Sequence, residues 1–267
     1  MTFTIVFDLD ELIVNMQLGK SPETELQRAK TLLGEQCMEQ LTLVAMGCTY
    51  LVYPGFYEVF RWLHHQCHAI YFFSSGLEKR NIELVSSLMN RSFGNESDII
   101  MENIKIFSRH HCLDLRNVED DDQYQPFSLF GNYKKVLRNV VVPDEKIQYT
   151  LLIEDDPTYM MKGEEENMIL LPSGIAYVPA NQNDKSTLLS LHKSYLLCGI
   201  LDCIFSKALT KRITLTKASA QVHTNSENGK ITLDALREIR NNAAYYERGL
   251  SILRSFNPDL QFFGKMK

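Results

Sequence analysis

Residues 3–14 read FTIVFDLDELIV, an apolar strand that ends in two carboxylates, Asp8 and Asp10. Side chains alternate along a strand, so these two start on the same face. They also lie at its carboxyl end, which is where open α/β sheets bind ligands. Two close carboxylates repel each other unless a cation lies between them or one of them is protonated. The stretch therefore favours a buried strand of a parallel sheet and a site for a hard divalent cation such as Mg²⁺.

The same pair has a chemical use, because one carboxylate can act as a nucleophile and the other can carry a proton. The alternative is a strand that runs into an acidic turn, since Asp-x-Asp also occurs without a catalytic role. The residues that follow the other strands decide between these two interpretations.

The composition fits a globular protein with a sizeable core and argues against a nucleic-acid-binding protein. The chain has 267 residues, of which 45% are hydrophobic, enough for one large domain or two small ones. Its 28 basic and 33 acidic residues give a formal charge of −5. Nucleic-acid binding needs a basic face, and we find no basic stripe interleaved with aromatic residues. The six cysteines form no Cys-x-x-Cys pair, which favours free thiols in a reducing compartment.

The sequence favours a soluble, cytoplasmic protein. Its N-terminal residues lack the basic region of a secretory signal peptide and reach Asp8 almost at once. The most apolar later stretch, residues 195–205, contains Asp202 and is far shorter than the roughly 20 residues that span a bilayer. Secretion by a route without a cleaved N-terminal signal stays open, and the oligomeric state is not predicted.

Apolar strands alternate with amphipathic helices over the first two thirds of the chain. The predicted strands cover residues 3–7, 69–73 and 149–153, with edge strands at 168–171 and 175–178. The predicted helices cover residues 21–46, 56–65, 77–91 and 133–140. This alternation predicts a central parallel sheet with right-handed crossovers, and hence a three-layer, Rossmann-like α/β fold.

Residues 180–267 differ from this pattern. Helices are predicted at residues 184–206 and 231–256, and no strand there ends in a carboxylate. We therefore divide the chain into a core of residues 1–179 and a helical C-terminal extension or subdomain.

Two stretches of the core are interpreted as helical or lid insertions, residues 15–52 and 77–131. Domains typically begin near roughly 50 residues, so these insertions build at most a small cap. The acidic run at residues 119–122 is predicted to be a solvated loop. A site at the sheet edge should therefore be open.

Polar side chains also follow the second and third predicted strands, at the same edge of the sheet. The second strand is followed by Ser74 and Ser75, the third by Glu154, Asp155 and Asp156, and between them lie Lys134 and Lys135. Carboxylates suit Mg²⁺, while hydroxyl groups, turn N–H groups and a lysine suit phosphoryl oxygens. Together with Asp8 and Asp10 they predict a site for a metal and a phosphate.

These motifs, in this order, resemble those of the haloacid dehalogenase (HAD) superfamily over residues 3–160. The most similar branch is that of the FCP/small CTD phosphatases and the related magnesium-dependent phosphatases. The segments that carry the resemblance are DLDE at 8–11, YPG at 53–55, FSSGL at 73–77, IFSRHHC at 106–112, GNYKK at 131–135 and IEDDP at 153–157. The resemblance implies a HAD-like fold with a small cap or none.

The resemblance also implies roles for the acidic residues. Asp8 would be the nucleophile and form an aspartyl-phosphate, and Asp10 would protonate the leaving oxygen and later deprotonate the attacking water. Mg²⁺ would be bound by Asp8, the backbone carbonyl of Asp10 and Asp155. Whether Glu154 or Asp156 also serves the metal stays open.

For the phosphoryl group, the resemblance implies binding by Ser74, Ser75 and Lys135. Lys134 competes with Lys135 for this role, and the G-N-Y-x-K spacing favours Lys135. An acid two residues after the nucleophile suits hydrolysis of a phosphomonoester, because an oxygen leaving group needs a proton.

We therefore expect a Mg²⁺-dependent phosphatase that acts on phosphorylated proteins, with phosphotyrosine favoured over phosphoserine or phosphothreonine. A small phosphomonoester is a further possible substrate. The alternatives are a non-catalytic binding or adaptor module on a HAD scaffold, and a secreted bacterial effector phosphatase that acts on host proteins.

Overall fold

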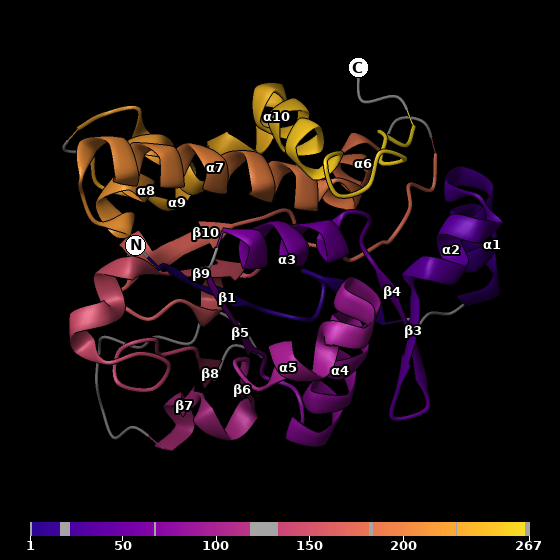
Figure 1. Cartoon of the computed structure of the whole chain (residues 1–267), viewed down its shortest axis with the longest axis horizontal. Coiled ribbons are helices and arrows are strands. Elements are labelled where there is room, and N and C mark those ends of the chain that lie inside the picture. Colours follow the sequence, from indigo (N-terminus) through magenta and orange to yellow (C-terminus); the bar gives the residue numbers. More distant parts are fainter. Residues whose placement is uncertain are drawn as a thin grey trace.

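A computed structural model describes residues 2–16, 22–66, 68–117, 133–181, 184–227 and 229–264. Its centre is a five-stranded parallel sheet in the order β10–β9–β1–β5–β6 (Figure 1). The strands are β1 (Thr4–Phe7), β5 (Ala69–Phe73), β6 (Lys105–Phe107), β9 (Thr150–Glu154) and β10 (Met168–Leu170). The predicted α/β fold with a central parallel sheet is confirmed.

The register brings the carboxyl ends of the three inner strands together. Phe7 of β1 lies opposite Phe72 of β5 and Ile153 of β9. Asp8 directly follows Phe7, so it lies between the ends of β5 and β9. The polar residues that follow these strands therefore converge on Asp8.

Both faces of the sheet are apolar, which is why β1 reads as an uninterrupted hydrophobic run. Ile5 and Phe7 belong to a large core cluster with α3 (Phe56–His65), α4 (Glu78–Phe93) and α7 (Lys193–Lys211). Val6 points the other way, into a second cluster with Phe73 and Leu152. Alternation along the strand thus builds one core on each face.

The helix predicted at residues 21–46 is wrong as a single element. The chain forms α1 (Pro22–Leu33) and α2 (Glu35–Leu41), and Gly34 between them has a φ of 87° that no helix contains. The last residues instead form β3 (Thr42–Ala45), which pairs with β4 (Cys48–Val52) in the antiparallel sheet β2–β4–β3.

The third strand of that sheet is β2 (Val14–Met16), which pairs with β4. Met46 and Gly47 both have positive φ, 50° and 73°, which suits a two-residue hairpin turn between β3 and β4. The hairpin packs beside α4 (Figure 1). The β-branched residues after Leu41 and this turn outweigh the helical pattern before them.

Two further predictions differ from the structure. Residues 133–140 are not helical: β8 (Tyr133–Lys134) pairs with β7 (Leu113–Asp114), and Asn139 has a φ of 60°, which ends any helix there. Residues 175–178 form no strand.

The range 77–131 is also more than an insertion, because β6 is an edge strand of the central sheet. It further contains α5 (Ser97–Met101). Short 3-10 helices occur at Gly94–Glu96, Arg109–His111, Leu115–Asn117, Asp144–Tyr149, Pro157–Tyr159, Glu165–Asn167 and Ile239–Asn241. The acidic run at 119–122 and residues 131–132 lie outside the described residues.

The C-terminal helices share the core of the sheet and lie together along one side of it (Figure 1). Besides α7 they are α6 (Lys185–Leu191), α8 (Leu215–Thr224), α9 (Leu233–Glu238) and α10 (Ala243–Leu253). α7 adds Leu197 and Leu201 to the cluster that contains Phe7, and α8 and α9 add Ala220 and Leu236 to the cluster on the other face. Both cores therefore depend on this region.

Gly55 joins the start of α7 to the turn at residues 53–55. It has a φ of 89° and precedes α3. A Cβ atom there would lie 2.6 Å from Ser194 Oγ and 2.8 Å from the Tyr195 ring, and Ser194 Oγ donates a hydrogen bond to the Pro54 carbonyl. The turn and the helix start can approach this closely only with glycine.

The cysteines and the apolar helices concern two of the expectations from the sequence. Free thiols are found at Cys37, Cys48, Cys112, Cys198 and Cys203. Among the described residues, no single helix has the length and apolar composition to cross a membrane. α6 and α7 together have that length and composition, but the chain bends by 62° between them.

His192, between α6 and α7, makes stability dependent on pH. Its Nδ1–H donates to the Leu188 carbonyl at 2.8 Å, and its Nε2 accepts from the Phe263 N–H at 2.9 Å. Burial lowers the pKa of His192 from 6.5 to about 4. Between about pH 4 and pH 6.5, His192 therefore stays neutral in the folded protein but is protonated in the unfolded chain. This stability is present above pH 6.5 and is lost as the pH falls toward 4.

We expect the free energy of unfolding to fall by about 2 kcal/mol from this residue between pH 8 and pH 5. The measurement is urea unfolding at both pH values for the wild type and His192→Gln. The variant should lose less stability on acidification than the wild type, because other histidines contribute equally to both. An equal loss in the two proteins would contradict the assignment to His192.

Candidate active site

Asp8 and Lys135 form a buried ion pair at the end of β1. Asp8 is 5% exposed, and its N–H donates to the Ile153 carbonyl at 3.0 Å, which extends the sheet pairing. Lys135 Nζ donates to Asp8 Oδ1 at 2.5 Å and to Glu154 Oε2 at 2.6 Å, and Lys135 is fully buried. One ammonium group therefore holds two carboxylates from neighbouring strands.

The backbone around Lys135 selects it over Lys134. The Lys135 N–H donates to the Tyr159 carbonyl at 2.9 Å, and its Nζ lies 4.6 Å from the centre of the Tyr159 ring. Lys134 points elsewhere, and its Nζ donates to the Thr158 carbonyl. The structure thus brings Lys135, and not Lys134, to Asp8.

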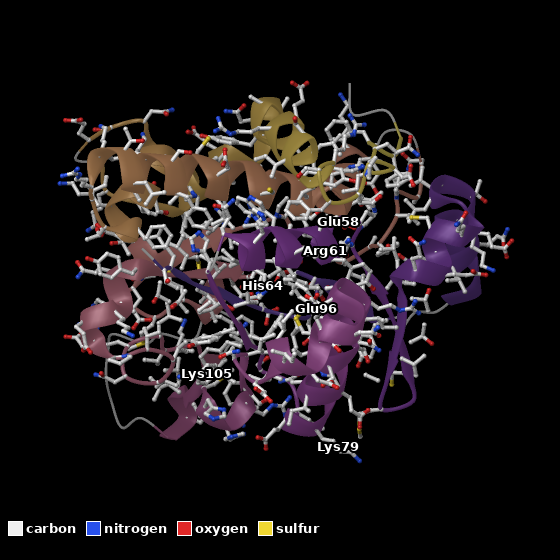
Figure 2. The ribbon with its side chains drawn as sticks, viewed as in Figure 1. Glu58, Arg61, His64, Lys79, Glu96 and Lys105 are labelled. Carbon is white, nitrogen blue, oxygen red and sulfur yellow. The ribbon has the colours of Figure 1, made fainter. Side chains whose placement is uncertain are left out.

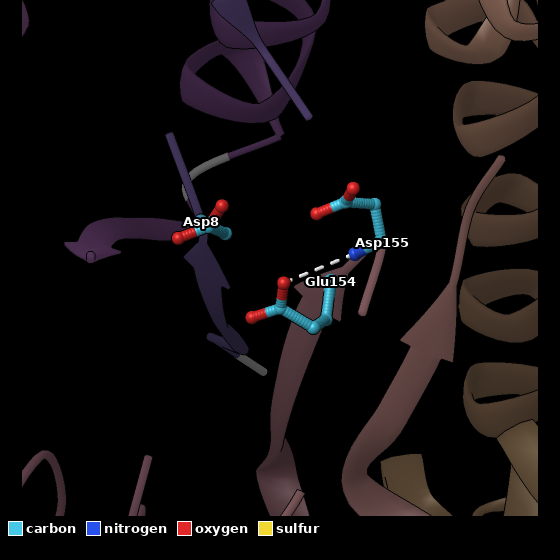
Figure 3. A group of neighbouring side chains, drawn as sticks. All are labelled: Asp8, Glu154 and Asp155. Atoms are coloured by element: carbon cyan, nitrogen blue, oxygen red, sulfur yellow. Dashed lines mark hydrogen bonds between the residues drawn. The ribbon is translucent and has the colours of Figure 1, made fainter. Parts of the chain in front are cut away.

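Three buried carboxylates come together at the ends of β1 and β9. Ligand oxygens of Asp8, Glu154 and Asp155 all lie within 4.8 Å of one another, and Asp155 turns its carboxylate toward Asp8 (Figure 3). The Glu154 carboxylate already has two partners: one oxygen pairs with Lys135, and the other accepts a hydrogen bond from the Asp155 N–H at 3.1 Å. Asp156 instead accepts from the Thr158 N–H at 2.8 Å.

Asp155 is different from these neighbours. It is 8% exposed, and its carboxylate accepts no hydrogen bond from the described residues. A buried carboxylate without a partner is costly. Oxygen donors from Asp8 and Asp155 suit a hard divalent cation such as Mg²⁺, so the residues present fit the implied metal.

The charges of the cluster shift its pKa values. Burial raises the pKa of Asp8 to about 7, and the charges of Asp10 and Asp155 add to this effect, while Lys135 opposes it. Burial opposes the charge of Lys135, but Asp8 and Glu154 raise its pKa well above its ordinary value. Lys135 therefore stays protonated.

Asp10 lies at the outer side of this cluster, with a side chain that is 41% exposed. Arg80 of α4 donates to both carboxylate oxygens, at 2.8 and 2.6 Å, and Ser74 Oγ donates to Oδ2 at 3.1 Å. Ser74 is fully buried, whereas the Ser75 hydroxyl bonds with the Tyr159 hydroxyl at 3.0 Å. The structure thus brings Ser74 to Asp10 and turns Ser75 aside.

The sequence interpretation missed Arg80. The signal available was a single arginine in the first turn of the helix that follows Ser74, preceded by Gly76. A Cβ atom at Gly76 would lie 1.9 Å from Arg80 Nη2, so only glycine leaves room for this side chain to reach Asp10. Such a requirement concerns a side-chain path and cannot be read from spacing.

Comparisons with known proteins identify similar solved structures. The chain is similar to the phosphatase Fcp1. A structure of a fission yeast RNA polymerase II CTD phosphatase Fcp1 variant bound to beryllium fluoride has 13% sequence identity and a TM-score of 0.41, over 98% of this chain and 68% of that one. A second structure of Fcp1 has 13% identity and a TM-score of 0.40 over the same shares. No protein-family model and no curated protein sequence matches the chain.

Proposed function

We propose that the protein is a Mg²⁺-dependent phosphatase that hydrolyses phosphomonoesters through an aspartyl-phosphate on Asp8. The observation that carries this proposal is the buried Asp8–Lys135–Glu154 cluster beside the carboxylate of Asp155, whose oxygen lies within 4.8 Å of ligand oxygens of Asp8 and Glu154. The order of motifs in the sequence supports the same assignment. A nucleophile, a fixed ammonium group and a cation site are what phosphoryl transfer needs, since its catalysis is mostly positioning and charge neutralisation.

The chain's own residues have distinct roles in this reaction. A carboxylate oxygen of Asp8 attacks phosphorus, and the bond from phosphorus to the ester oxygen breaks. Asp10 gives a proton to that leaving oxygen and then takes one from the water that hydrolyses the aspartyl-phosphate. Lys135 and Ser74 bind the phosphoryl oxygens. Mg²⁺, held by Asp8, Asp155 and the Asp10 carbonyl, would supply neutralisation of the phosphoryl charge when bound.

The substrate class follows from the openness of the site. The side chain of Asp10 is 41% exposed and that of Arg80 is 14% exposed, and a phosphorylated side chain on a protein surface needs such access. We assign phosphorylated proteins as the substrates and favour phosphotyrosine, whose long side chain reaches a recessed nucleophile. Phosphoserine and phosphothreonine peptides are the competing substrates.

The test is turnover of para-nitrophenyl phosphate with Mg²⁺ and with a chelator, followed by matched phosphopeptides. We expect Mg²⁺-dependent release of phosphate, and higher kcat/KM for a phosphotyrosine peptide than for its phosphoserine counterpart. Phosphopeptide binding without any turnover would instead identify a non-catalytic binding module. A preference for phosphoserine would correct the substrate assignment alone.

Loss of Arg80 should lower kcat/KM by about 10²-fold, because the bidentate contact that orients Asp10 disappears. Arg80→Met removes the contact directly. Gly76→Ala leaves the arginine in place but blocks its path, so it should lower activity in the same direction. The measurement is kcat/KM for para-nitrophenyl phosphate.

Lys79→Met is the matched control, since Lys79 is the preceding residue and lies exposed at the surface (Figure 2). Its kcat/KM should stay within about twofold of the wild type. Equal activity of Arg80→Met and Lys79→Met would show that Arg80 has no role in the reaction.

A further inference from the structure

Lys193 brings a positive charge from the C-terminal region to the candidate active site. It is the first residue of α7 and is fully buried. Its Nζ donates to the Glu11 carbonyl and lies 3.9 Å from the centre of the Tyr53 ring. Its close partners among the described residues are thus a carbonyl oxygen and an aromatic face.

This position is unfavourable for an ammonium group. Burial removes its hydration, and the N-terminal end of a helix carries a positive partial charge that repels it. Burial lowers the pKa of Lys193 to about 7, and the charges of Asp155, Glu11 and Asp8 oppose that effect. The negative charge of the active site is therefore what favours a cation here.

Glu11 connects Lys193 to the catalytic loop. It directly follows Asp10 and has a φ of 56°, a conformation that few residues with a side chain adopt. Its carbonyl also accepts from the Gly174 N–H at 3.1 Å, and its carboxylate accepts from Ser173 Oγ at 2.9 Å. The backbone beside Asp10 is thus held by residues that precede α6 and by the start of α7.

Lys135 forms its ion pairs with Asp8 and Glu154, and no ion pair of Asp155 is found within the described part of the chain. Among the carboxylates that act on Lys193, Asp155 has the largest effect. Arg240, from the same C-terminal region, also lies in the field of Asp155, and its Nε donates to the Leu170 carbonyl. The C-terminal region therefore supplies the positive charge on this side of the site.

We propose that Lys193 is a positioning residue of the active site, which holds the Asp10–Glu11 turn through the Glu11 carbonyl and places an ammonium group beside the acidic cluster of Asp8 and Asp155. A divalent cation at Asp155 then binds against the repulsion of this ammonium group. The inference rests on the proposed metal site but does not depend on phosphatase turnover. It makes residues 180–267 a part of the site.

Calorimetric titration of the substrate-free protein with Mg²⁺ alone tests whether the charge of Lys193 weakens metal binding. Lys193→Met and Lys193→Gln should each bind Mg²⁺ at least about fivefold more tightly than the wild type, because a nearby like charge is removed. The glutamine amide can still donate to the Glu11 carbonyl, which separates the charge from the hydrogen bond. Lys185→Met, at the exposed first residue of α6, should bind within about twofold of the wild type.

Thermal unfolding supplies a second measurement. Saturating Mg²⁺ should raise the melting temperature of both Lys193 variants by more than it raises that of the wild type, because the variants bind the ion more tightly. A merely structural lysine would give weaker or unchanged Mg²⁺ affinity and an equal loss of stability with and without Mg²⁺, and either result overturns the proposal. Failure of both variants to fold even with Mg²⁺ would also overturn it.

The two proposals fail in different ways. Tighter Mg²⁺ binding by the variants of a protein that hydrolyses no phosphomonoester would support the role of Lys193 and overturn the phosphatase assignment. A wild-type protein that binds no Mg²⁺ would overturn the role of Lys193, whatever its phosphatase activity.

Discussion

Asp8→Asn should abolish turnover of para-nitrophenyl phosphate, with kcat lowered by at least about 10³-fold. Asparagine has the shape of aspartate, but its amide is too weak a nucleophile to attack phosphorus. Lys135 keeps its ion pair with Glu154 at 2.6 Å, so the buried ammonium group is not left alone. The loss of turnover should therefore come from the missing nucleophile, and the fold should stay intact.

Stability separates this loss from unfolding. Burial raises the pKa of Asp8 to about 7, above its unfolded value of 3.8. The stability that comes from a protonated Asp8 is thus present below pH 3.8 and is lost as the pH rises toward 7. Near pH 8, and without metal, the ionised carboxylate opposes folding, so Asp8→Asn should melt at an equal or higher temperature than the wild type.

The matched control is Asp144→Asn, at an exposed residue paired with Arg138 on the surface. It should change kcat by less than about twofold. Full activity of Asp8→Asn would show that Asp8 is not the nucleophile. A large drop in its melting temperature would mean that the carboxylate stabilises the fold and that the reasoning from its pKa is wrong.

Local sequence is informative for the inner strands because burial on both faces leaves a plain signal. β1, β5 and β9 are largely apolar, and α3 has the same bounds as predicted. The positions of the candidate site residues at the ends of those strands follow from parallel register, which needs no knowledge of loops. Asp8, Ser74 and Asp155 were accessible from the sequence for this reason.

The sequence is less informative where distant segments decide the structure. The hairpin β3–β4 depends on pairing and on a turn with positive φ, which compete with helical periodicity in the same stretch. Arg80 reaches Asp10 only because Gly76 lacks a side chain. Lys193 follows Glu11 by 182 positions, so no local pattern connects them.

Lys135→Met should lower the free energy of unfolding of the metal-free protein by about 3–5 kcal/mol, because it leaves buried carboxylates without their cation. Lys135 is fully buried between Asp8 and Glu154; Glu154 is fully buried as well, and Asp8 is only 5% exposed. Urea unfolding near pH 8 measures the change. Turnover should be lost as well, since the same ammonium group is proposed to bind the phosphoryl oxygens.

The adjacent Lys134→Met is the control for the loss of a lysine side chain. Lys134 is half-buried, and its one hydrogen-bond partner among the described residues is the Thr158 carbonyl, so its loss should cost about 1 kcal/mol. Equal destabilisation by the two variants would show that the buried pair has no special role.

A second substitution tests the cause. Glu154→Gln removes one of the carboxylates that Lys135→Met leaves unpaired, so the double variant should be more stable than Lys135→Met alone. Acid should act in the same direction, because burial raises the pKa values of both Asp8 and Glu154. The carboxylates take up protons as the pH falls through those raised values, and the difference between Lys135→Met and the wild type should then shrink. A difference that stays constant from pH 8 to pH 5 would place the cost in lost packing rather than in charge.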